Sequence, residues 1–155
     1  MVEDYKNKYE FNLTYFIKNN INSDFYIVRN DRRKLINDNK TLKLFLKQSK
    51  YVRIIEDKGD ILGVSGIWKF NDNNIIKEYV KINAINTDIF EKLLVVTIWN
   101  SKKDLFIKIK KDSNFLYILR NKKFEYLESE KSNNSEILMS YSKYKKNYNS
   151  KNKEI

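Results

Sequence analysis

The side chains of this chain that could carry chemistry are carboxylates, amines, phenols and hydroxyls, because its 155 residues include neither histidine nor cysteine. These two absences exclude a cysteine nucleophile, a serine–histidine pair, an imidazole base and the usual kind of zinc site. The only three glycines, Gly59, Gly63 and Gly66, lie within eight positions. No glycine loop elsewhere can therefore cradle a phosphate.

Basic side chains outnumber acidic ones, with 31 Lys and Arg against 20 Asp and Glu, for a formal net charge of +11. Such an excess favours nucleic acid, acidic proteins or anionic membranes as partners. Lys, Asn, Ile and Tyr are over-used, and their codons are AT-rich. A low-GC genome therefore also explains the bias, and we favour that interpretation.

Two groups of cations are candidates for binding. The basic patch, at the start of a helix that we predict over residues 31–48, consists of Arg29, Arg32, Arg33 and Lys34. It suits phosphate or an acidic partner, or it is simply a solvated helix face, which we favour. In the tail over residues 143–155, lysines alternate with tyrosines. This tail suits single-stranded nucleic acid, a neighbouring subunit or a flexible terminus.

Apolar spacing predicts the elements that must position these groups. Helices are expected over residues 4–20, 31–48 (capped by Asp31), 88–100 and 112–122. Strands are expected over residues 24–28, 51–55, 61–70, 75–85, 105–109, 124–127 and 137–139. Together they predict one α+β domain over residues 1–142, with a central, mostly antiparallel sheet of about six strands and helices on both faces. Trp68 and Trp99 are expected in the core.

No apolar run approaches the roughly 18 to 20 residues that span a bilayer. The first twelve residues are charged and unlike a signal peptide. We therefore expect no membrane partner and a location in the cytoplasm, or in a virion if the chain comes from a phage.

The order of elements from residue 24 to 139 resembles that of the GNAT superfamily of N-acyltransferases. Residues 104–127, DLFIKIKKDSNFLYILRNKKFEYL, resemble the family's closing strand–helix–strand unit. The resemblance implies a cofactor, acetyl-coenzyme A, held by backbone N–H groups in a Gly-x-Gly turn after the fourth strand. It also implies a gap between the strands at 76–84 and 105–109 that receives the pantetheine arm.

The same resemblance assigns site residues. Aligning Leu93-Leu94 with the family's leucine pair places Asp88 and Phe90 at the two glycine positions. Asp88 would repel a diphosphate, and Phe90 would obstruct its approach to the backbone. In an active member, the cofactor would contact Ile82, Asn83, Asp88 and Asn114.

In an active member, Glu78 would also be the general base and Tyr117 the general acid, the latter after a shift in register. Glu78 shares its strand face with apolar neighbours, and the alternative that we favour is a sheet residue paired with Lys69 or Lys77.

We therefore expect a catalytically degenerate GNAT-like domain without a cofactor, acting through protein contacts as a phage virion or accessory protein. One alternative is an active acyltransferase that uses acetyl-coenzyme A through a divergent loop. Another is a basic module that binds nucleic acid, which strong salt dependence of binding would support.

Overall fold

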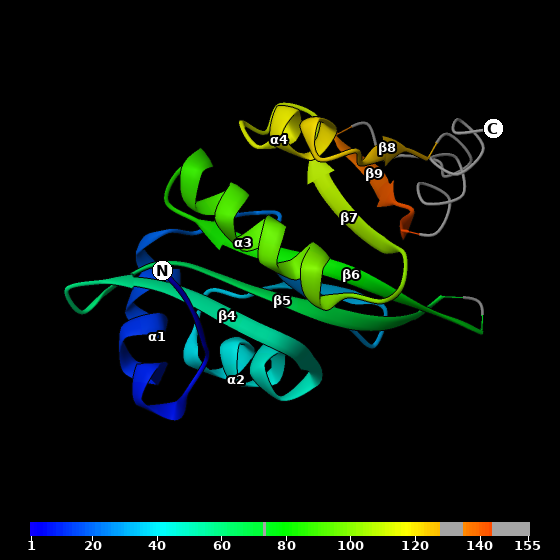
Figure 1. Cartoon of the computed structure of the whole chain (residues 1–155). Helices are drawn as coiled ribbons and strands as arrows, with labels where there is room; N and C mark the ends of the chain where they lie inside the picture. Colours follow the sequence, from blue (N-terminus) through cyan, green and yellow to red (C-terminus); the bar gives the residue numbers. More distant parts are fainter. Residues whose placement is uncertain (73, 128–134, 144–155) are drawn as a thin grey trace.

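The computed structural model describes residues 1–72, 74–127 and 135–143. Seven strands form one mixed sheet (Figure 1). In sheet order they are β1 (Val2–Asp4), β4 (Ser49–Asp57), β5 (Asp60–Asp72), β6 (Ile75–Ala84), β7 (Leu105–Lys110), β9 (Glu136–Tyr141) and β8 (Glu125–Tyr126). All neighbours are antiparallel except β6 and β7. The α+β prediction is confirmed, with seven strands rather than about six.

Helices cover both faces of this sheet (Figure 1). One face carries the single turn η1 (Asn7–Tyr9), α1 (Glu10–Asn19) and α2 (Asn39–Gln48). The other face carries α3 (Thr87–Asn100) and α4 (Leu116–Asn121). The buried apolar residues form two clusters, one on each face. The sheet is thus the shared wall of two cores.

A separate hairpin, β2 (Tyr26–Arg29) and β3 (Arg32–Leu35), replaces the start of the helix that we predicted over residues 31–48. Asn30 and Asp31 form its turn with φ of 52° and 58°. A two-residue turn needs positive φ at both residues to match the twist of the two strands. Asp31 therefore caps no helix. Asp38 does, because its carboxylate accepts a hydrogen bond from the Thr41 N–H at 2.8 Å.

The two tryptophans differ in environment. Trp68 on β5 is 5% exposed, as predicted, whereas Trp99 near the end of α3 is 81% exposed. The buried stripe of α3 ends at Thr97, so position 99 falls on the side of the helix that faces away from the sheet. The core prediction for Trp99 was wrong. Within the described residues, no helix combines the length and apolar content needed to cross a bilayer.

Candidate functional site at the separation of β6 and β7

Strands β6 and β7 are the sheet's parallel pair, and they are bonded over a short distance. Their register contains two pairs, Glu78 with Leu105 and Tyr79 with Phe106. Each strand then continues several residues beyond its last partner. The sheet therefore splits toward the carboxyl ends of both strands, and the split is the candidate site.

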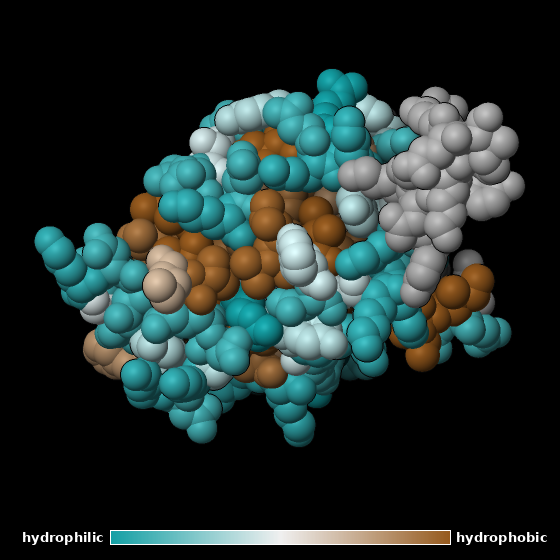
Figure 2. Space-filling model, in the orientation of Figure 1, coloured by the Kyte–Doolittle hydropathy of each residue, from teal (hydrophilic) through white to brown (hydrophobic). Residues whose placement is uncertain are grey.

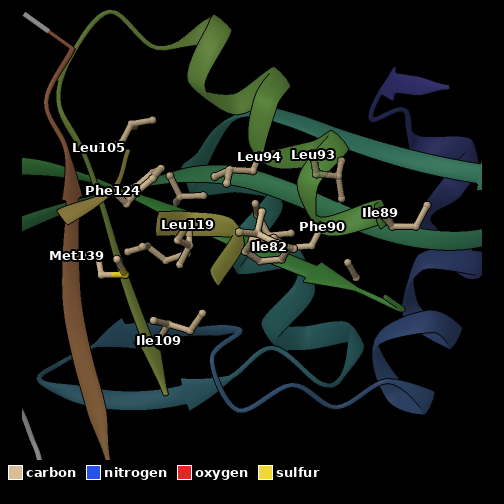
Figure 3. Close-up of a cluster of buried hydrophobic side chains, with 14 of the residues drawn as sticks. Ile82, Ile89, Phe90, Leu93, Leu94, Leu105, Ile109, Leu119, Phe124 and Met139 are labelled. Atoms are coloured by element: carbon tan, nitrogen blue, oxygen red, sulfur yellow. The ribbon is translucent and has the colours of Figure 1, made fainter. Parts of the chain in front are cut away.

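Apolar side chains fill the split on the α3 face. The rings of Phe90 on α3 and Phe115, just before α4, stack with centroids 4.3 Å apart and planes 8° apart. Ile82 and Ile109, from the two separating strands, belong to the same buried cluster (Figure 3). The cavity that borders these two rings between the strands is about 10 Å³, which is at the lower limit for one water.

The start of α3 follows directly after β6. Asn86 caps it, and its side-chain oxygen accepts a hydrogen bond from the Ile89 N–H at 2.9 Å. The Phe90 N–H bonds the Asn86 carbonyl. Asp88 is exposed in the first turn and its carboxylate lies 3.1 Å from the Lys92 ammonium. The backbone N–H groups of Ile89 and Phe90, which could otherwise bind an anion, thus already have acceptors within the protein. The negative charge of Asp88 lies beside them.

A cavity of about 380 Å³ opens at the carboxyl ends of β6 and β7. Asn83 and Asn114 both line it. Asn83 is 2% exposed, and its side-chain N–H donates to the Asn20 carbonyl at 2.8 Å. Asp24, also in the lining, accepts a hydrogen bond from the Lys110 N–H at 3.0 Å. Burial raises the pKa of the Asp24 carboxyl. Polar groups of this cavity thus have partners within the protein.

The two predicted catalytic residues lie in different places. Glu78 is 2% exposed and its Oε2 lies 2.5 Å from the Lys50 ammonium. Lys69 is opposite Glu78 in the sheet register, but the ion pair is with Lys50. Tyr117 is 56% exposed and lines a cavity with Thr87 that does not include Glu78. Ile82, predicted to contact a cofactor, is a core residue.

The basic patch lies on the β2–β3 hairpin rather than on a helix. Its four residues are exposed. Arg33 is paired with the carboxylate of Glu136 and stacks on the ring of Tyr26, with 3.6 Å between its guanidinium carbon and the ring centroid. Of the tail, Lys143 donates from its ammonium to the Ser101 carbonyl at 2.6 Å. Residues 144–155 lie outside the described part of the chain.

Sequence reasoning missed two features of this region. One is the Phe115 ring that fills the split, since only tertiary packing pairs it with Phe90. The other is Lys81, which is 5% exposed. The alternation of faces along β6 is the signal that could have placed its side chain on the face opposite Glu78. Among the described residues, no group of His, Cys, Asp or Glu could hold a metal ion.

The fold is shared with solved acetyltransferases. A ribosomal-protein-alanine N-acetyltransferase from Brucella melitensis superposes with a TM-score of 0.69 at 12% identity, over 92% of this chain and 99% of that one. A GNAT-family acetyltransferase from Streptococcus pneumoniae gives 0.63 at 13% identity, over 92% and 98%. A putative acetyltransferase from Salmonella typhimurium, solved with acetyl-coenzyme A, gives 0.67 at 12%, over 92% of both chains. No protein-family model and no curated protein sequence matches this chain.

Proposed function

We propose that this chain, which has the GNAT fold, is a catalytically degenerate member of that fold and acts through protein contacts. The packed split between β6 and β7 is the observation that carries the proposal. If acetyl-coenzyme A bound as the family resemblance implies, its pantetheine arm would need the volume that the Phe90 and Phe115 rings occupy. A cavity of about 10 Å³ does not admit that arm.

The residues at the start of α3 also disfavour binding of acetyl-coenzyme A. A diphosphate there would meet the Asp88 carboxylate and would compete with the Asn86 side chain for the Ile89 N–H. The residues present at the start of α3 therefore do not fit the diphosphate of the cofactor.

Exposed apolar side chains support a role in protein contacts. Figure 2 shows apolar surface at the tip of the β5–β6 hairpin, where Ile75 and Ile76 are 62% and 63% exposed. Phe11 and Tyr15 on α1 are 82% and 67% exposed. Grouped apolar surface of this kind is typical of interaction sites. We further propose that the protein is a phage virion or accessory protein, a source that the AT-rich codon composition suits. Identification of the source genome tests this part.

An active acyltransferase is the second candidate, and the cavity of about 380 Å³ at the open end of the split favours it. Under this alternative, Glu78→Gln abolishes transfer of the acyl group to an amine. Unchanged turnover in that variant would remove Glu78 from the role of base.

Calorimetric titration with acetyl-coenzyme A separates the two candidates. We expect no binding stronger than a Kd of about 1 mM. Asp88→Asn removes the like charge while the rings stay in place, and Glu91→Gln is the matched control on the same helix. We expect neither variant to bind the cofactor. Micromolar binding by the unmodified protein overturns the proposal. Micromolar binding by Asp88→Asn alone would show that the charge, not the packed split, is the obstacle.

A further inference from the structure

A second cavity lies at the same strand separation but on the α1 and α2 face of the sheet. Tyr79 and Phe106 form the last bonded pair of β6 and β7. Lys81 and Lys108 each lie two residues further along, so both point to the same face on opposite sides of the split. They line a cavity of about 210 Å³, together with Tyr26 from the β2–β3 hairpin.

The charges around Lys81 are unbalanced. Its side chain is 5% exposed, and its ammonium lies 3.8 Å from the centroid of the Tyr26 ring. Burial lowers the pKa of Lys81 to about 7, and the positive charges of Lys108 and Arg33 act in the same direction. The carboxylates of Glu136 and Asp24 oppose this lowering only partly. Among the described residues, none forms an ion pair with Lys81. An anion in the cavity would supply the missing charge.

The walls of the cavity are aromatic. Trp68, Phe70 and Tyr79 line it beside Tyr26. Trp68 is 5% exposed, and its indole N–H has no hydrogen-bond acceptor within the described chain. A buried donor without an acceptor lowers the stability of the fold. An oxygen of a ligand in this cavity could accept the indole hydrogen bond after a small rotation of the Trp68 side chain.

We propose that this cavity binds a small molecule with a single carboxylate on a flat apolar body, such as one aromatic ring. The carboxylate would lie between the ammonium groups of Lys81 and Lys108, and the ring would pack on Tyr26 and Tyr79. An apolar cavity of about 150 Å³ holds benzene, so 210 Å³ suits one ring and one carboxylate. Asp31 also lines the cavity, which disfavours a second negative charge. The inference does not depend on whether acetyl-coenzyme A binds.

The test uses benzoate as the probe and Trp68 as the reporter. Trp99→Phe leaves Trp68 as the only tryptophan, and Trp99 is far more exposed, so the substitution leaves the core unchanged. We expect benzoate at pH 6.5 to change Trp68 emission saturably. Benzamide, the neutral analogue, should bind at least about tenfold more weakly, because a charge-assisted hydrogen bond is lost.

Variants in the Trp99→Phe background locate the site. Lys81→Met should weaken benzoate binding at least about tenfold, while Lys69→Met, which removes an exposed lysine from β5, should leave it unchanged. A circular dichroism melt of each variant verifies that it is folded. Absence of a saturable change, equal binding of benzamide, or an equal loss in both lysine variants would overturn the proposal.

Discussion

At the scale of single residues, β6 places two buried charged groups on opposite faces of one strand. Glu78 lies against the Lys50 ammonium at 2.5 Å. Lys81 instead lies over the Tyr26 ring with like charges nearby. A buried charge that is paired costs less than one that is not. The buried charge of Lys81 should therefore cost the fold more stability than the paired charge of Glu78 does.

We predict that Lys81→Met stabilises the protein below pH 7. The amine has a pKa of about 7 in the folded chain, against about 10.4 when unfolded. Between these values the unfolded chain binds one more proton, so the lysine's cost to stability falls as pH rises. At pH 6 the full cost is present, and the methionine variant should be more stable by a few kcal/mol, roughly 2 to 5.

Urea unfolding of both proteins from pH 6 to 10 measures this difference. The gain from Lys81→Met should shrink as pH rises above 7, while Lys69→Met should show no such trend. A gain that stays constant over the whole range would contradict the buried amine. The groups that set the local field are Lys108, Arg33, Glu136 and Asp24.

At the scale of elements, the approach of α3 to the sheet decides how the split is filled. Gly63 on β5 lies under this helix, where an added Cβ would be 2.7 Å from the Ile89 Cγ2 and 2.8 Å from the Leu93 Cδ1. Both distances are shorter than a normal carbon contact. Glycine therefore lets α3 pack closely on the sheet, with Phe90 in the split.

We predict that Gly63→Ala destabilises the fold by about 1 to 3 kcal/mol, because the helix must move away from the sheet. Chemical denaturation measures the change. Ser65→Ala on the same strand is the control, since it deletes a buried hydroxyl without a hydrogen-bond partner and should be nearly neutral. An equally small effect in both variants would show that α3 does not need the close approach.

At the scale of the whole molecule, one sheet joins the two cores. Ile67 belongs to the α3-side cluster and Trp68, the next residue on β5, to the α1-side cluster. If β5 unfolds, the packing contacts on both of its faces are lost together. The described chain should therefore unfold as one cooperative unit.

Unfolding of Trp99→Phe tests this cooperativity. Trp68 fluorescence then reports the α1-side core alone, while far-ultraviolet circular dichroism reports all helices and strands. We expect coincident midpoints in guanidinium chloride. Two separated midpoints would mean that the two faces of the sheet unfold independently.

Much of the fold could be predicted because local patterns determine it. The turn of the β4–β5 hairpin needs positive φ, which Lys58 and Gly59 adopt at 51° and 88°, and the alternation along β6 assigned each residue to its face. The β2–β3 hairpin was missed because Asn30 and Asp31 serve equally as turn residues and as helix caps. Local sequence did not decide between these two roles.

Some features of the candidate site could also be predicted from the sequence, whereas others could not. The sequence by itself determined that histidine and cysteine chemistry is absent and that Asp88 and Phe90 stand where the resemblance requires glycines. Only the tertiary structure decided that Phe115 stacks on Phe90, that Glu78 pairs with Lys50, and that Lys81 is buried beside Lys108. The physical reason is that these contacts join residues far apart in the chain. Their energies depend on burial and on distances through space, which no spacing along the sequence encodes.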